Sequence, residues 1–426
     1  TAADTLKVNL NSAVEIALSE NPTIKIADKE IERVDYSKKA AWGALLPSLS
    51  ASAQYSHFAV AGKTIQFGTE IDIPTEFNLD ASIALSLPII APALWHSVKM
   101  SALDMQMASE KARASKITLR NEVTKAFYNM LLAQDSYDAL QDGYKIADEN
   151  FHLAENRYKA GMGSEYDYIS AEVQMNNLLP SLLQVENGIR QANLYLKVLL
   201  GVADTVPLAV EGKLAQLEKD VVRNADPTTP ALANNPDLVQ LNIQQMQLDK
   251  SLQLQRSPRL PMLVGFGQYG YTGSQSGEMN LNFGGAPISI AEQPFKMLPS
   301  GLILGLQLSV PIFKGFTNVH KEKQIKIQSL ELELQREYIE KTLSVQVRAA
   351  LDNMEKAVKQ MDSNKKAVQL AEKGNKIATT RYNQGMGTML ELNSSALSLT
   401  QSKLAYNQAI SDYLNAKTDY EKIIGE

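Results

Sequence analysis

The chain has 426 residues, a formal net charge of −5 and no cysteine, and its 42 lysine and arginine residues are scattered along it. Scattered positive charge argues against nucleic-acid binding, because such proteins concentrate lysine and arginine on one face or in one run. The lack of cysteine excludes a disulfide framework, a thiolate metal site and a cysteine nucleophile. No apolar run approaches the ~18 residues of a membrane-spanning helix.

The first predicted elements are a helix at 22–46 and a pair of strands. A weak strand at 48–60 precedes a strong one at 77–89, and a long polar loop is expected between them, around 62–76. The strong strand alternates apolar residues with small or polar ones and exceeds the ~9–11 residues of a tilted transmembrane strand. One continuously apolar face is typical of an outer-membrane barrel wall. A half-buried sheet in a soluble domain is the alternative interpretation of such alternation.

A very long helix is predicted next. Between Ala93 and Lys159 there is no proline and a single glycine, Gly143, and apolar residues recur every three or four positions. At 1.5 Å per residue this helix reaches ~100 Å, which no globular core requires. A returning helix at 164–200 follows, with interruptions expected at Pro180 and Gly188. The helices 22–46 and 164–200 together nearly match the long helix in length, so we expect them to stack end to end as its partner.

The second half of the chain repeats the first. Three landmarks recur in the same order: Asn21-Pro22 as Asn235-Pro236, Leu85–Ile89 as Leu308–Ile312, and Arg157-Tyr158-x-x-Gly161-Met162-Gly163 as Arg381-Tyr382-x-x-Gly385-Met386-Gly387. Repeats at a fixed spacing must be recognised first because they define the fold. The predicted organisation is a first repeat at 1–201, with a strand pair at 48–90 and a helical hairpin at 92–200. A linker or equatorial segment at 202–234 and a second repeat at 235–426 follow, the latter with strands at 261–313 and a hairpin at 314–424.

Two features of the second repeat support this organisation. A heptad line from Val347 to Val368 indicates coiled-coil packing. Apolar residues at 302–312 alternate as they do in the first repeat, with a polar loop around 273–299 before them. Four strands cannot close a barrel within one chain, and an open sheet edge cannot lie in lipid. The barrel must therefore be shared between chains.

Two strands, a long helix, a Gly-x-Gly turn and a returning helix, all duplicated, resemble the TolC-like outer-membrane factor family. The resemblance covers essentially the whole chain. It rests on the Asn-Pro and Arg-Tyr-x-x-Gly motifs and on a Leu-Pro motif before the first strand of each repeat, at Leu46-Pro47 and Leu260-Pro261. It implies a mixed α+β membrane protein in which three chains share one 12-stranded transmembrane β-barrel, with four strands from each chain. The helices would continue as a long α-helical coiled-coil barrel.

The resemblance also implies a location and a set of partners. A homotrimer would lie in the bacterial cell outer membrane, in contact with its lipid, and its helical part would lie in the periplasm. It would be the passive exit duct of a tripartite efflux or type I secretion system and dock to a periplasmic adaptor and an inner-membrane pump. Neither an enzymatic activity, a cofactor nor a metal is implied. The alternative is a soluble periplasmic coiled-coil adaptor or scaffold, which explains the heptads but not the two strand pairs.

The candidate site residues lie at the two helical hairpin tips. Glycine supplies the positive φ that such reversals need, so plain turns explain part of the pattern. The two arginines are expected to bond helix-end carbonyls. The resemblance adds that the tips contact the adaptor through Arg157, Tyr158, Gly161, Gly163, Arg381, Tyr382, Gly385 and Gly387.

An aperture and a latch are also implied by the resemblance. Glu391 maps onto a ring of carboxylates at the aperture, Asp167 is the corresponding residue of the first repeat, and Ser394 stands where the family has a second acidic residue. Clustered carboxylates favour cations and raise one another's pKa. A solvated charge on a helix face is the alternative for Glu391. The family latch would join Tyr382 to Asp167, and it would be partial because its arginine position is Gly387 here.

Overall fold

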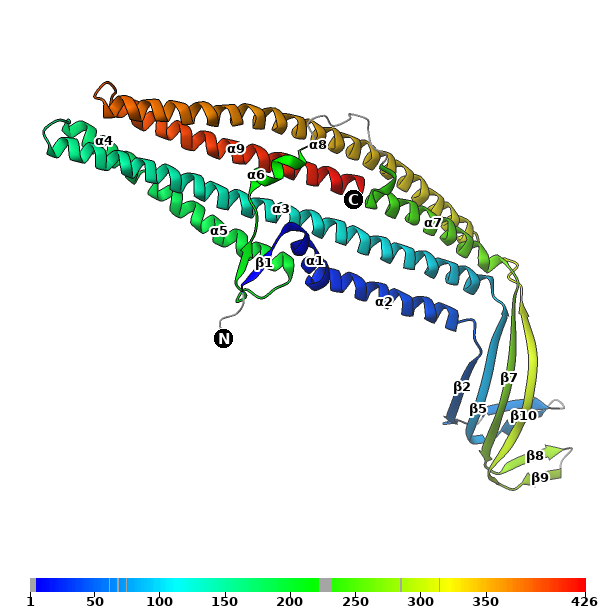
Figure 1. Ribbon diagram of the computed structural model, residues 1–426. Helices are drawn as coiled ribbons and strands as arrows, with labels where there is room; N and C mark the ends of the chain where they lie inside the picture. Colours follow the sequence, from blue (N-terminus) through cyan, green and yellow to red (C-terminus); the bar gives the residue numbers. More distant parts are fainter. Residues whose placement is uncertain are drawn as a thin grey trace. The chain divides into compact units, whose positions relative to one another are not determined.

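The structure is a computed structural model that describes residues 5–60, 62–66, 69–73, 75–221, 232–283, 286–313 and 315–426. The chain forms two compact units, traced in Figure 1. Unit 1 comprises Thr1–Glu32, Gln106–Gln244 and Glu331–Glu426, and unit 2 comprises Arg33–Met105 and Gln245–Leu330. Each unit takes segments from both sequence repeats. Within the described ranges, no helix is long and apolar enough to cross a membrane.

Long helices dominate both repeats. The first repeat has α1 (Leu10–Glu20), α2 (Pro22–Gly43), α3 (Pro92–Lys159), α4 (Glu165–Asn176) and α5 (Leu179–Leu200). The second has α7 (Pro236–Arg256), α8 (Thr317–Asn383) and α9 (Met389–Ile424). The α3 helix has 68 residues and α8 has 67, so each extends ~100 Å, as predicted. The heptad line of α8 lies on its buried side, where Val347, Met354 and Met361 are almost completely covered.

Two expectations for the returning helix have different outcomes. The break near Pro180 is confirmed, because α4 ends at Asn176 and α5 begins at Leu179. The interruption at Gly188 is wrong, since α5 runs through it to Leu200. A single glycine keeps its backbone N–H and costs a helix only about 1 kcal/mol, whereas proline removes a hydrogen bond. The short helix α1 was not anticipated, and part of the predicted linker at 202–234, residues 222–231, lies outside the described residues.

The recurring Asn-Pro motif joins α2 to α5 in the first repeat and α7 to α9 in the second. Asn21 Nδ2 donates to the carbonyl of Leu199 at 2.7 Å, while its Oδ1 accepts from the N–H of Thr23. In the same way, Asn235 Nδ2 donates to the carbonyl of Ile423 at 2.8 Å, and its Oδ1 accepts from the N–H of Asp237. Each asparagine therefore caps the start of one helix and binds the end of another. This contact explains the end-to-end arrangement predicted from helix lengths.

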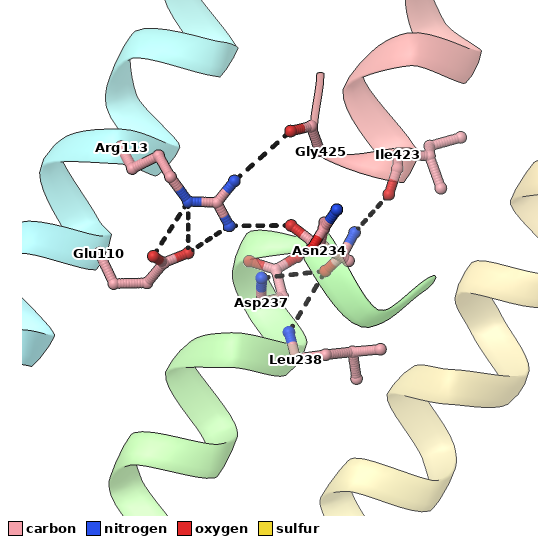
Figure 2. A network of polar contacts seen from close by, with 8 residues as sticks. Glu110, Arg113, Asn234, Asp237, Leu238, Ile423 and Gly425 are labelled. Atoms are coloured by element: carbon pink, nitrogen blue, oxygen red, sulfur yellow. Dashed lines mark hydrogen bonds and ion pairs between the residues drawn. The ribbon is translucent and has the colours of Figure 1, made fainter. Parts of the chain in front are cut away.

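The second junction has an additional clamp, shown in Figure 2. Arg113 on α3 donates through Nη2 to the carbonyl of Asn234 at 2.8 Å and through Nη1 to that of Gly425 at 3.4 Å. Its guanidinium is held by the carboxylate of Glu110, whose side chain is mostly buried. This hydrogen bond to Glu110 is the main reason that the pKa of Arg113 is raised. The long helix of the first repeat is thus bound to the chain's C-terminal turn.

A segment after α5 connects the two helical hairpins. Strand β6 (Leu208–Val210) pairs in parallel with β1 (Leu6–Val8), and α6 (Leu214–Leu217) then packs on α9. The N–H of Leu214 donates to Asp135 on α3 at 2.9 Å. Glu218 accepts from Lys365 Nζ on α8 at 2.9 Å and from the Tyr406 hydroxyl on α9 at 2.7 Å. One short segment therefore holds α3, α8 and α9 together.

Replacing Asp135 with Asn should stabilise the protein at neutral pH. Burial raises the pKa of Asp135 above its usual range, although the hydrogen bond from Leu214 acts in the opposite direction. A raised native pKa means that the folded state binds the proton more tightly than the unfolded state does. The stabilisation that comes from the protonated Asp135 carboxyl is therefore lost as pH rises through the native pKa. An asparagine oxygen still accepts the N–H bond without a buried charge. Urea midpoints should therefore fall less between about pH 4 and pH 7 in D135N than in the wild type. Equal pH dependence would contradict this account.

The sheet in unit 2 has four antiparallel strands in the order β10-β7-β5-β2. Their bounds are β2 (Ser48–His57), β5 (Thr75–Ile90), β7 (Met262–Ser276) and β10 (Gln293–Ser309). The two strands of each repeat pair with each other, and β5 with β7 joins the repeats. The register is the same in both repeats: Leu85 lies opposite Leu49, and its counterpart Leu308 lies opposite Leu263. Strands β2 and β10 are the open edges.

The loops predicted between the strands are partly wrong. Two hairpins occupy them: β3 (Gly62–Gln66) with β4 (Thr69–Ile73), and β8 (Met279–Phe283) with β9 (Ala286–Ile290). Strands β5, β7 and β10 also extend further into these regions than expected. The sequence Met-Asn-Leu-Asn-Phe of β8 alternates apolar and polar residues, which is the strand pattern that the polar composition of the region concealed.

Candidate functional site

The two hairpin tips have the same backbone geometry. Gly161 and Gly385 follow α3 and α8 and have φ values of 72° and 74°. The N–H of Met162 donates to the carbonyl of Arg157 at 2.9 Å, and the N–H of Met386 donates to that of Arg381 at 2.9 Å. A left-handed glycine with this bond from the next residue is the Schellman ending, which satisfies carbonyls that the helix leaves free. The predicted turns are confirmed.

The next glycine of each tip is favoured by close packing. A Cβ at Gly163 would come within 3.0 Å of the Arg157 Cβ, and one at Gly387 within 3.1 Å of the Tyr382 backbone nitrogen. The returning helices then begin with side-chain caps, because Ser164 accepts from the N–H of Asp167 at 3.0 Å. In the second tip, the side chains of Thr388 and Glu391 each accept from the other's backbone N–H. Both tips are thus closely packed turns between capped helix ends.

A small apolar cluster holds the two tips of one chain together. Its buried members come from both hairpins: Ala154, Ala171, Tyr382, Met389 and Leu392. Arg157 Nη2 also crosses from the first hairpin to the second, where it donates to the carbonyl of Asn383 at 3.1 Å. Arg381 Nη2 donates to the carbonyl of Met386 within its own turn at 3.2 Å. Arg157 therefore bonds a carbonyl at a helix end, as expected, whereas Arg381 bonds a carbonyl of the turn that follows α8.

Tyr382 lies at the centre of this cluster with 3% of its surface exposed. The Arg157 guanidinium carbon is 4.7 Å from the centre of its ring. Burial is the main cause that raises the pKa of Tyr382, Arg157 lowers it, and the charge of Asp167 raises it further. The contact that the structure shows for Tyr382 is with Arg157, and Asp167, the other predicted latch residue, acts on it only through its charge. Whether they act as a latch stays a prediction.

Glu391 has a structural role at the start of α9. Its backbone N–H donates to the Thr388 hydroxyl at 3.2 Å, and its carboxylate accepts from the Thr388 N–H at 3.3 Å. This is a capping box, and the pattern Thr-x-x-Glu that specifies it is visible in the sequence. Glu391 and Ser394 are both exposed. The predicted carboxylate ring at an aperture is compatible with this position but stays a prediction.

Exposed apolar side chains at the tips form a feature that the motif analysis missed. Met162 is 77% exposed and Met386 62%, and Tyr166 and Leu390 beside them are equally accessible. Methionine is flexible and polarisable, and it is common on surfaces that bind other proteins. The signal was present as the methionine between the two glycines of each motif. Among the described residues, no group of three His, Asp or Glu side chains could hold a metal ion.

The second candidate surface is one face of the sheet in unit 2. Directly paired residues share a face, so Ile83, Tyr269 and Leu302 form one row across three strands. On β10 the same face carries Leu304 and Leu306, which are 74% and 68% exposed. The opposite face includes Ser82, Gln268 and Gln307. The predicted alternation is confirmed, and a wide exposed apolar face is typical of a surface that meets lipid or another protein.

Three aromatic residues of this sheet gather near one end of the apolar face. Phe77 lies between Tyr55 and Phe295, with ring centres 5.5 Å and 5.4 Å away. Aromatic side chains at the border of an apolar band are typical of the interface between lipid and water. Long duplicated helical hairpins together with such a sheet define a subunit of a membrane export channel.

Comparison with known proteins agrees with this class. The family model described as "Outer membrane efflux protein" matches residues 13–202 and 229–426. The chain belongs to this family. It is an export channel of the outer membrane with a periplasmic helical part, and it is not an enzyme. The alternative of a soluble adaptor or scaffold is therefore wrong.

Individual relatives are distant in sequence but similar over most of the chain. The chain is 21% identical to the outer membrane protein TolC of Vibrio cholerae, over 93% of this chain and 85% of that protein. It is 24% identical to the alkaline protease secretion protein AprF of Pseudomonas aeruginosa, over 73% of this chain and 62% of that protein. The open-state structure of the MtrE outer membrane channel of Neisseria gonorrhoeae has a TM-score of 0.72 at 18% identity, covering 98% and 88% of the two chains. At 18% identity, the similarity to MtrE shows that the two chains share a fold.

Proposed function

We propose that three copies of this chain form one outer-membrane duct, which receives cargo from an inner-membrane pump through a periplasmic adaptor. The observation that carries the proposal is the sheet, which has an apolar face and two open edges. Unpaired backbone groups cannot lie in lipid, so the edges must pair with other strands. A drug, a metal ion or a secreted protein could each use such a passive duct.

The two open edges are complementary to each other. Inside the chain, β5 pairs with β7, and Leu85 lies opposite Gly267. The counterpart of β5 is β10 and the counterpart of β7 is β2, so the edges of two copies repeat the pairing that already joins the repeats. In this register Leu308 of one copy lies opposite Ala53 of the next, and the apolar face continues unbroken. Two copies would give an eight-stranded barrel that side chains fill, whereas three copies leave an open lumen.

The hairpin tips supply the docking surface for the adaptor. Their turns are fixed by glycine geometry and by the Arg157 bond, while Met162, Met386, Tyr166 and Leu390 remain exposed. A rigid frame with flexible apolar side chains suits a partner that is also helical and apolar at its tip. Closure of the tips would rest on the cluster around Tyr382, which must be disturbed when cargo passes.

The mass of the complex and one engineered cross-link test the proposal. In detergent, the protein component should weigh about three times 46.9 kDa after bound detergent is subtracted. Because the chain lacks cysteine, the pair Leu308→Cys and Ala53→Cys introduces the only thiols. Oxidation should give a covalent trimer, and a reductant should separate it into single chains again. A monomer that stays soluble without detergent would overturn the proposed duct.

Replacing Glu391 with Gln should lower the preference of the channel for cations. Three carboxylates close to one axis attract cations, and glutamine removes the charge while it still serves at the third position of a capping box. The fold should therefore be unchanged. Reversal potentials in a salt gradient across a planar bilayer measure the preference, with Ser394→Ala as the control that leaves it unaltered. Equal selectivity in E391Q and the wild type would remove Glu391 from the aperture.

A further inference from the structure

A cluster of three charged side chains lies in unit 2, where the second repeat passes between its helices and its strands. Arg256 ends α7, Arg259 ends the short turn Ser257–Arg259 that follows, and Glu322 lies in the second turn of α8. Arg256 Nε donates to Glu322 Oε2 at 3.2 Å, and Arg259 Nη2 lies 2.5 Å from Glu322 Oε1. The Glu322 side chain is 12% exposed, whereas those of Arg256 and Arg259 are 50% and 46% exposed.

This cluster keeps a net positive charge, because two guanidinium groups share one carboxylate. Within the described part of the chain, no second carboxylate pairs with either arginine. Arg259 approaches Glu322 as an ion pair whose N–H groups are not aligned for a hydrogen bond. A guanidinium carries five N–H donors, so most of them remain for another acceptor. The cluster can therefore bind an anion.

The first repeat shows that the same junction can be built without charge. In the register of the Leu-Pro motif, Arg259 corresponds to Leu45. The long helices are related by the shift of 224 residues that the two tip motifs define, so Glu322 corresponds to Val98, which is buried. Apolar residues at such a place are often at least as stabilising as a buried ion pair. The charges of the second repeat therefore indicate a role other than folding.

An apolar groove adjoins the arginines. Its volume is about 380 Å³, and Arg259 lines it together with Pro311, Ile312, Phe313 and Phe316. Ile312, Phe313 and Phe316 are 97%, 73% and 68% exposed, and the two phenylalanine rings meet edge to face with centres 5.8 Å apart. This volume is in the range of sites for small molecules. One opening therefore offers an apolar wall and a positive charge side by side.

The groove lies where the apolar face of the sheet ends and the helices begin. Strand β10 ends at Ser309, its alternation of apolar residues continues from Leu308 through Val310 to Ile312, and α8 begins at Thr317. Because the helical part of this family lies in the periplasm, this end of the sheet is the periplasmic border of the membrane. At such a border, aromatic and basic side chains meet lipid headgroups.

We propose that the groove binds one glycerophospholipid of the periplasm-facing leaflet per chain, with the lipid phosphate at Arg259 and Arg256 and an acyl chain along Phe313 and Phe316. A guanidinium matches a phosphate through two parallel N–H···O bonds. The net positive charge favours a lipid with an anionic headgroup. The proposal rests on the position of the sheet in the outer membrane, and it does not require that three copies share one barrel.

Native mass spectrometry tests the site in the full-length protein, extracted in detergent, stripped of lipid and titrated with dioleoylphosphatidylglycerol. The wild type should retain one lipid per chain. Arg259→Gln should weaken binding about tenfold or more, because a charged hydrogen bond is lost. Arg259→Lys should lie between them, since lysine keeps the charge without the planar fork. Arg336→Gln is the matched control, because Arg336 is 49% exposed on α8 in unit 1, and it should bind as the wild type does.

Replacing Glu322 with Gln separates lipid binding from folding. Glutamine removes the carboxylate that competes for the two guanidinium groups, so E322Q should bind the lipid more tightly than the wild type. A cluster that serves only folding would behave differently. In that case R259Q and E322Q would lower the thermal unfolding midpoint alike and neither would change lipid retention, which would overturn the proposal.

Two other ligands identify the part of the lipid that is recognised. Dioleoylglycerol has no phosphate and should bind at least about tenfold more weakly, since the charged hydrogen bonds are missing. Inorganic phosphate has no acyl chain and should not displace the lipid at millimolar concentration. Equal binding of dioleoylglycerol would show that the arginines play no part, and displacement by phosphate would show a simple anion site. Either result would overturn the proposal.

The aromatic wall is tested by Phe316→Ala, and the result also separates this proposal from the proposed duct. F316A should weaken lipid binding while the mass of the complex stays that of the wild type. If F316A instead dissociates the complex and binds lipid normally, the groove is a contact between copies and the lipid site is wrong. A wild-type protein with the mass of one chain that still retains the lipid would count against the duct alone.

Discussion

A lysine at Leu306 should prevent stable insertion into the membrane. Leu306 lies on the apolar face of β10, 68% exposed, in line with Gly265 and Leu87 on the neighbouring strands. A lysine on the lipid-facing side of a barrel near the bilayer midplane costs roughly 2–4 kcal/mol, and three copies would each carry it. The folded fraction recovered from outer membranes, and its resistance to urea, should both fall strongly.

The neighbouring residue provides a matched control for this prediction. Gln307 follows Leu306 on the same strand, so its side chain points to the opposite face. Lysine at Gln307 would face the water-filled lumen and should leave both measurements nearly unchanged. If L306K and Q307K behave alike, the assignment of the two faces of the sheet would be incorrect.

Replacing Asn235 with Ala should cost about 2–3 kcal/mol of folding free energy, from a lost helix cap and an unpaired carbonyl. Asn235 is 3% exposed, and its amide binds Ile423 while its oxygen caps α7 through Asp237 and Leu238. Two helices of the second repeat depend on this one side chain. Urea unfolding should show the loss, and hydrogen exchange should rise first in the last turn of α9.

Two further variants separate the roles of this asparagine. Serine at position 235 can still cap α7 but is too short to reach the carbonyl of Ile423, so N235S should lie between N235A and the wild type. Asn21→Ala should produce a similar loss in the first repeat, at the end of α5. A wild-type exchange pattern in N235A would show that the junction is held by other contacts, such as the Arg113 clamp.

The features that could be predicted from sequence are those with a local cause. Alternation in β5 and β10, the unbroken helical stretch of α3 and the glycines of the tips each act over a few residues, and each was identified correctly. Because the chain is internally duplicated, each such feature in one half is expected at the corresponding place in the other half. The tip turns at Gly161 and Gly385 are the clearest case, because a left-handed residue can be read directly from a glycine at a helix end.

The features that were missed depend on residues far apart in the chain. Arg157 binds the carbonyl of Asn383, and Glu218 binds Lys365 and Tyr406, yet none of these pairs has a spacing that indicates a contact. The hairpins β3–β4 and β8–β9 were hidden by polar composition, since short strands carry little periodic signal. Gly188 does not interrupt α5, because one glycine weakens a helix without ending it.

The pairing of β5 with β7 has a consequence for the order of folding. Leu49 and Leu85 pair across a few tens of residues, whereas Leu85 and Gly267 are brought together from opposite halves of the chain. Distant pairings form slowly, because the entropy of closing a long loop is lost before any contact compensates for it. The helical hairpins and the two strand pairs should therefore form first, and the complete apolar face last. A chain that must cross an aqueous compartment before it reaches lipid would thus expose its full membrane surface only near its destination.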